Sequence, residues 1–205
     1  YIRLFQSASI SFLLLFFYLA EHILPNPGGQ VAAEALSLRV GQFNVLCYAD
    51  EHEALASQAA SMEADLLSFQ EVNQAWKSEL DSQLCAQFPY AYATLSETSA
   101  YGLLLYSRFP LQDTEILARD GVRSLSAKAV TPQGLVQIIT THTQSPMTSR
   151  RYANRNRHLT YWADTLAKEQ TLPTLLIGDM NAVPWDPGMV QLRQRSKLQD
   201  ARTQL

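Results

Sequence analysis

The chain has 205 residues, of which 47% are hydrophobic and 17% are charged, and its formal net charge at pH 7 is −3. This composition excludes an intrinsically disordered chain, which has few apolar residues and a high net charge. It also argues against a general nucleic-acid-binding protein, because such proteins usually carry an excess of basic residues. A local basic patch would suffice for a nuclease, so nucleic acid is a disfavoured partner and not an excluded one.

The N-terminus begins with a long apolar run. Residues 8–20 carry no charge, and Leu4 and Phe5 extend the run to about the 17 residues that are the lower limit for crossing a bilayer. We predict a transmembrane anchor (or uncleaved signal) over residues 1–24 and a linker over residues 25–35. A cleaved signal is one alternative, because Val31-Ala32-Ala33 resembles a signal-peptidase site; a buried helix is the other.

The charges beside this run predict a topology. Arg3 is the one cation that flanks it, and the acidic Glu21 follows it. Because basic residues favour the cytoplasmic side, we expect the chain to be bound to a membrane by a single or last span. The domain that follows would then lie on the extracytoplasmic side.

The rest of the chain, residues 36–205, has the pattern of one α/β domain. Strands are expected over residues 36–45, 65–72, 90–94, 102–107, 114–118, 124–130, 134–141 and 172–178. Helices are expected over residues 51–64, 74–88 and 148–170. The five short runs from residue 90 to residue 141 are separated by turn signals and are predicted to form a meander. The whole pattern predicts a mixed sheet or a pair of sheets flanked by helices.

Polar residues interrupt the apolar pattern where four of these strands end. They are Asn44, Glu71, His142 and Asp179, with Asn181 two positions after the last. In layered α/β proteins, functional sites gather where strands end. Asp179 and Asn181 face the same way in an extended segment, so both can reach one phosphate or one metal ion. Taken singly, each residue also has a plain interpretation as a turn former, a solvated loop residue or a structural histidine.

These residue types suit the chemistry of a hard divalent cation, which binds oxygen ligands and needs few of them from the protein if it is Mg²⁺. Glu71 is the natural ligand, and Asn44 and Asn181 can complete or orient the site through their amide groups. His142 can donate a hydrogen bond to a phosphoryl oxygen as negative charge develops there. Asp179 can accept a proton or hold another group in place.

Five segments now carry a resemblance to a known family. They are residues 39–46, 65–72, 102–111, 141–142 and 178–184. In this order they resemble the endonuclease/exonuclease/phosphatase superfamily, which includes DNase I-like nucleases, neutral sphingomyelinases and inositol-polyphosphate phosphatases. The resemblance spans about residues 36–201. With the apolar segment ahead of the domain, the chain is similar to the membrane-tethered bacterial envelope members of the group.

The resemblance implies a four-layer α/β sandwich, in which two packed mixed sheets are flanked by helices and the site lies at one edge. It implies Mg²⁺ or Mn²⁺ held mainly by Glu71, with Asn44 supporting the metal and the scissile phosphate. Asp179 and Asn181 would position the phosphate and the attacking water, and His142 would stabilise the transition state or protonate the leaving group.

The implied activity is hydrolysis of a phosphodiester or phosphomonoester by in-line attack of water. We expect a monomer with a phosphoester substrate, and the substrate class (lipid, nucleic acid or small ester) stays open. A non-catalytic binding domain that retains the fold is the alternative.

Two further segments bear on the site. Residues 150–157 hold four arginines at the start of a helix, and Arg150 and Arg151 are predicted to bind the substrate phosphate; a solvated helix face is the alternative. Members of the family end in a strand followed by an Asp-His pair. Asp200 is not followed by His, so we expect the last strand and motif to be missing from a C-terminally truncated domain.

Overall fold

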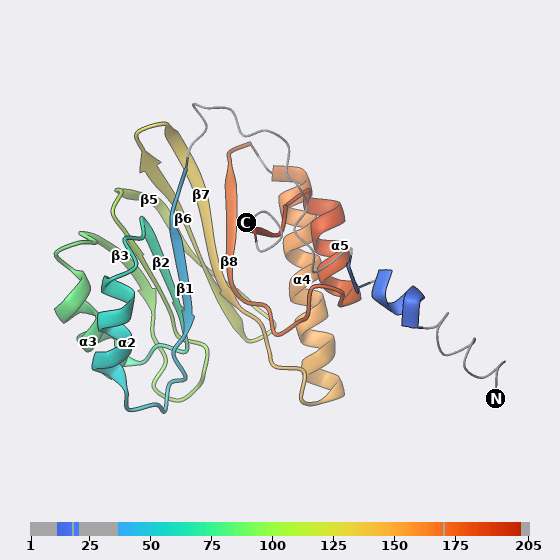
Figure 1. Ribbon diagram of the computed structural model, residues 1–205, viewed down its shortest axis with the longest axis horizontal. Helices are drawn as coiled ribbons and strands as arrows, with labels where there is room; N and C mark the ends of the chain where they lie inside the picture. Colours follow the sequence, from blue (N-terminus) through green and yellow to red (C-terminus); the bar gives the residue numbers. More distant parts are fainter. Residues whose placement is uncertain (1–11, 18, 21–36, 170, 202–205) are drawn as a thin grey trace.

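The computed structural model describes residues 12–17, 19–20, 37–169 and 171–201. Two four-stranded mixed sheets pack face to face, and each sheet has two helices on its outer face (Figure 1). This confirms the predicted pair of packed mixed sheets flanked by helices.

The first sheet has the strand order β1-β2-β4-β3. Its elements are β1 (Val40–Asn44), α2 (His52–Ala60), β2 (Leu66–Gln70), α3 (Gln74–Leu84), β3 (Tyr90–Thr94) and β4 (Leu103–Ser107). The pair β1 and β2 is parallel, because α2 returns the chain to the same end of the sheet. Both α2 and α3 cover the outer face, where Trp76 and Leu80 pack with Phe69 and Tyr106.

The second sheet has the strand order β5-β6-β7-β8. Its elements are β5 (Leu111–Arg119), β6 (Val122–Thr131), β7 (Gly134–His142), α4 (Ser149–Glu169), β8 (Thr174–Asp179) and α5 (Pro187–Ser196). The pair β7 and β8 is parallel, joined through α4. Leu159 and Trp162 of α4 and Leu192 of α5 pack with Ile139 on the outer face. Each sheet therefore contains one parallel pair of strands.

The predicted meander is wrong in one respect, because its five strands divide between the sheets. β3 and β4 extend the first sheet beside β2, whereas β5, β6 and β7 start the second. The chain crosses over at Pro110, whose carbonyl accepts a hydrogen bond from Val130 N at 2.9 Å. Local alternation identifies strands but does not specify the sheet to which each strand belongs.

The layer between the sheets is mostly aliphatic. Leu66, Leu103 and Leu105 of the first sheet pack against Ala127 and Ile138 of the second. At the middle of β2 and toward the end of β7 the layer becomes polar, and the hydroxyl groups of Ser68 and Thr140 are 3.2 Å apart across the two sheets. A fully buried hydrogen bond thus fixes the position of one sheet relative to the other.

The predicted membrane anchor falls mostly on residues that the structure does not describe. Residues 12–17 and 19–20 are helical, and the large apolar side chains of residues 12–17 are exposed. Within the described residues, no helix is both long enough and apolar enough to cross a bilayer. The anchor, the linker and the topology remain predictions.

Candidate active site

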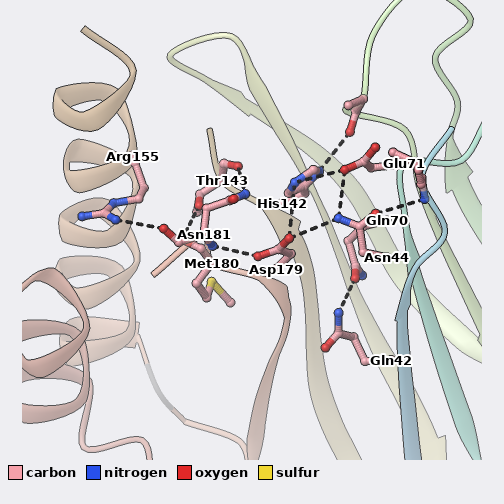
Figure 2. Close-up of polar contacts among 12 residues, drawn as sticks. Gln42, Asn44, Gln70, Glu71, His142, Thr143, Arg155, Asp179, Met180 and Asn181 are labelled. Carbon is pink, nitrogen blue, oxygen red and sulfur yellow. Dashed lines mark hydrogen bonds and ion pairs between the residues drawn. The ribbon is translucent and has the colours of Figure 1, made fainter. Parts of the chain in front are cut away.

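Four of the predicted site residues lie together at one edge of the sandwich (Figure 2). Asn44 ends β1 and Glu71 directly follows β2, so both come from the parallel pair of the first sheet. His142 ends β7 and Asp179 ends β8, and the two residues are register partners in the parallel pair of the second sheet. Because the carboxyl ends of parallel strands meet at one edge, each sheet contributes half of the site.

Asn44 joins the two halves. Its Nδ2 donates to Glu71 Oε1 at 2.9 Å and to Asp179 Oδ2 at 3.1 Å, while its Oδ1 accepts from Leu46 N at 3.2 Å. The bond from Leu46 identifies the oxygen of the amide, since a backbone N–H only donates. Asn44 therefore presents nitrogen to the two carboxylates. In this conformation it orients them and does not offer the oxygen that the predicted metal ligand would supply.

His142 completes the arrangement, and a backbone carbonyl holds its ring in place. Its Nδ1 lies 2.9 Å from the carbonyl oxygen of Ala100, which only accepts, so Nδ1 carries a proton. Its Nε2 lies 3.9 Å from Glu71 Oε1 and 3.8 Å from Asp179 Oδ2. Both distances exceed that of a hydrogen bond, so His142 Nε2 lies close to both carboxylate oxygens without bonding to either.

Unusual backbone conformations aim these side chains. Glu71 has φ 66° and Asn181 has φ 46°, both in the left-handed region that residues other than glycine rarely adopt. Such strain is typical of functional sites and persists where surrounding contacts enforce it. After Glu71, the chain is held by the bond from Val72 N to Gly102 O at 3.2 Å. The carboxylate is thus turned out of a fully buried strand, with 13% of its side-chain surface exposed.

The loop after β8 is fixed by Asp179 and Asn181. Asp179 Oδ1 accepts from Asn181 N at 2.8 Å, which leaves Oδ2 as the oxygen that faces Asn44 and His142. Asn181 Nδ2 donates to the carbonyl of Thr143 at 2.9 Å. The predicted residue Asn181 therefore ties the loop to the segment after β7, and its side-chain nitrogen is already engaged.

The arginine cluster divides into buried and exposed members. Arg150 and Arg151 are exposed and line a cavity together with Asp120, so the structure does not bring them onto the four strand ends. Arg155 is buried and reaches the site loop, donating to Asn181 O at 2.9 Å and to Asp186 Oδ2 at 2.6 Å. Sequence reasoning missed this role, because nothing in the spacing of Arg155 and Asp186 indicates that they pair.

Replacing Arg155 with methionine is expected to lower the free energy of unfolding by about 3 kcal/mol, because the buried carboxylate of Asp186 loses its partner. Urea unfolding measures the change. Asp186→Asn in the same background should recover part of the loss, since it removes the charge and keeps the side-chain oxygen that accepts from Gly188 N.

The control for this prediction is Arg157→Met, two positions along the same helix. Arg157 also pairs with an aspartate, Asp120, but 58% of its side chain is exposed. Exposed ion pairs contribute no more than about 1 kcal/mol. Equal losses for the two variants would show that burial of the Arg155 pair does not matter and would contradict the assignment.

Two shifted pKa values mark the surroundings of the site. Burial raises the pKa of the Cys47 thiol, and the nearby Glu71 carboxylate raises it further. Burial lowers the pKa of His158 to about 4. His158 Nε2 accepts from Trp162 Nε1 at 3.1 Å and lies 2.9 Å from the hydroxyl of Thr141, beside His142. The uncharged ring of His158 thus supports the end of β7 through its contact with Thr141.

The donor set fits a hard divalent cation that keeps most of its water ligands. Glu71 and Asp179 direct carboxylate oxygens into one space, and Mg²⁺ is usually bound through one or two carboxylates. Among the described residues, no group of three His, Cys, Asp or Glu side chains is arranged to hold a metal ion.

The sequence and the fold both match known proteins. A family model described as the Endonuclease/Exonuclease/phosphatase family matches residues 41–203. No curated protein sequence matches the chain. Sphingomyelinase C from Streptomyces griseocarneus has a similar structure, with a TM-score of 0.67 and 18% identity over 82% of this chain and 72% of that chain.

Two other solved structures share the fold. A variant of beta toxin from Staphylococcus aureus with bound magnesium ions has a TM-score of 0.64 and 17% identity, over 80% of this chain and 72% of that chain. TDP2 from C. elegans has a TM-score of 0.61 and 16% identity, over 71% of this chain and 48% of that chain. At such low identity these likenesses show the fold alone.

Proposed function

The chain belongs to the endonuclease/exonuclease/phosphatase family, and on that premise we propose that it is a divalent-metal-dependent hydrolase of phosphoester bonds. The observation that carries the proposal is the convergence of His142 Nε2, Glu71 Oε1 and Asp179 Oδ2 at one edge of the sandwich. The His142 Nε2 lies 3.8–3.9 Å from a carboxylate oxygen of each partner, so polar atoms of three residues point at one position. A reacting phosphate would bind beside these three side chains.

Each residue has a role that follows from its contacts. Glu71 would hold Mg²⁺ or Mn²⁺, and the bound cation would offset negative charge on the phosphoryl oxygens. Asn44 orients Glu71 and Asp179 through its two donated hydrogen bonds. Because Asp179 Oδ1 is engaged by Asn181 N, the acceptor for a proton of the attacking water is Oδ2.

His142 would contact the same reacting group as Asp179. The Ala100 carbonyl accepts from Nδ1–H and fixes the ring. In its doubly protonated form the ring also carries a proton on Nε2, which it can donate to a phosphoryl oxygen or to the leaving oxygen as charge develops. Water would attack in line with the departing oxygen, with the acceptor and the donor contributed by neighbouring strands of the second sheet.

The proposal is tested by turnover of two simple esters. Bis(4-nitrophenyl) phosphate reports phosphodiesterase activity, and 4-nitrophenyl phosphate reports phosphomonoesterase activity. We expect release of nitrophenol from at least one of them with Mg²⁺ or Mn²⁺ and none above background in EDTA. Binding of the metal without turnover of either ester would favour the non-catalytic binding domain.

A further inference from the structure

A cavity of about 460 Å³ lies between the β5–β6 turn and the start of α4. The residues that matter here are Asp120, Gln144, Asn154, Arg157, Arg150 and Arg151, all of which line it. Gln144 is two residues after His142, so its Cα lies within about 7 Å of the Cα of His142. The cavity and the proposed active site are therefore connected through the short segment that follows β7.

One wall of the cavity is a set of linked hydrogen bonds. Arg157 donates to Asp120 Oδ1 at 3.0 Å and to Asn154 Oδ1 at 2.6 Å. Asn154 Nδ2 donates to Gln144 Oε1 at 3.0 Å, and Gln144 Nε2 donates to the carbonyl of Asp120 at 3.1 Å. This wall is fixed before any ligand arrives, and Arg157 offsets the charge of Asp120, the one carboxylate among the residues that line the cavity.

The other wall of the cavity carries two guanidinium groups, those of Arg150 and Arg151. Neither Arg150 nor Arg151 has a side-chain hydrogen bond or ion pair with any residue that the structure describes, and both are exposed. They occupy the first turn of α4, where Thr148 Oγ1 accepts from Arg151 N at 3.2 Å and the helix presents the positive end of its dipole. Three guanidinium groups against one carboxylate leave a net excess of positive charge.

A second cavity provides a comparison within the same molecule. It has about 490 Å³ and is lined by Arg39 and Arg108 together with Glu63 and Asp65. Arg39 forms an ion pair with Glu63 at 2.7 Å. The two cavities are alike in size and in the presence of arginines, but in the second one the positive charges are matched by carboxylates.

We propose that the cavity of Arg150, Arg151 and Arg157 binds a second phosphate group of the substrate, next to the phosphate that is hydrolysed. Guanidinium groups bind phosphate oxygens through paired, charge-assisted hydrogen bonds. The inference rests on the proposed function for the position of the scissile phosphate. It assigns the substrate class: phosphoesters that carry another phosphate nearby, in preference to esters with a single phosphate.

The first test measures binding without metal, so it does not depend on hydrolysis. Equilibrium dialysis in EDTA compares thymidine 3′,5′-bisphosphate with thymidine 5′-monophosphate. We expect the wild type to prefer the bisphosphate, and Arg150→Gln with Arg151→Gln to lower that preference roughly tenfold. The matched control, Arg39→Gln with Arg108→Gln, removes the same charge from the second cavity and should keep the preference of the wild type.

Equal preference in the wild type and in the Arg150/Arg151 variant would overturn the proposal. An equal loss in both double variants would overturn it as well, because the effect would then come from overall charge. Turnover of the 4-nitrophenyl ester of thymidine 5′-phosphate, with and without a 3′-phosphate, extends the test to catalysis. A binding preference for the bisphosphate without any turnover would support the second phosphate site and contradict the proposed hydrolase activity.

Discussion

Glu71→Gln is expected to lower metal-dependent turnover on the order of 10³-fold, the largest effect on activity that we expect from any single site residue. Glutamine has nearly the same shape as glutamate and retains an oxygen that can accept from Asn44 Nδ2, as Glu71 does at 2.9 Å. It lacks the negative charge that would hold a divalent cation, at a side chain that is only 13% exposed. The loss should therefore appear in metal affinity and in turnover together.

Three measurements separate this interpretation from unfolding. The thermal midpoint in EDTA should be nearly unchanged, whereas the affinity for Mn²⁺, measured by titration calorimetry, should fall. The matched control is Glu115→Gln, the same change at an exposed position of β5, which should leave activity and metal affinity as they are. An active Glu71→Gln variant with normal metal affinity would show that Glu71 is not the principal ligand.

Gly178→Ala is expected to lower the free energy of unfolding by more than about 4 kcal/mol, the largest effect on stability that we expect. Gly178 has φ 139°, and a Cβ built there would lie 1.8 Å from the carbonyl oxygen of Thr141 on the paired strand β7. Neither atom can turn away, because both belong to the sheet. The strands would have to separate where His142 and Asp179 face each other, so activity should be lost with stability.

Gly134→Ala is the control for this prediction, and both variants are compared by urea unfolding. Gly134 also has a positive φ, 127°, but a Cβ built there meets nothing within 4 Å. That variant carries only the backbone strain, about 1 kcal/mol. If the two glycine variants lose the same stability, the close approach of β7 and β8 is not what requires Gly178.

The sequence alone was sufficient to predict which strand ends contribute polar residues to the candidate site. Asn44, Glu71, His142 and Asp179 each interrupt an apolar run, and an apolar run that ends in a polar residue is a local pattern. Their meeting was also expected, because functional sites of layered α/β proteins gather where strands end. In the structure, the parallel pairs β1–β2 and β7–β8 bring the carboxyl ends together within each sheet. These features depend on residues close together in the chain or on a general rule of topology.

The features that were missed depend on contacts between distant segments. Helix α5 has no clear apolar face, and it begins where Asp186 accepts a hydrogen bond from Gly188 N and Pro187 fits the first turn. The division of the strands between two sheets follows from packing and not from alternation. Arg155 resembles its neighbours Arg151 and Arg157 in sequence, and only the fold buries one of them beside Asp186.

The division of the site between two sheets makes its chemistry depend on the spacing between them. Asn44 and Glu71 stand on one sheet, His142 and Asp179 on the other, and facing sheets lie about 10 Å apart. Ala127, fully buried in the layer between them, helps to set that spacing. A bulkier residue at this depth would widen the gap, and a misplacement of about 1 Å can cost about 100-fold in rate. Turnover should therefore respond to the packing between the sheets. A substitution in this layer should reduce turnover before it prevents folding.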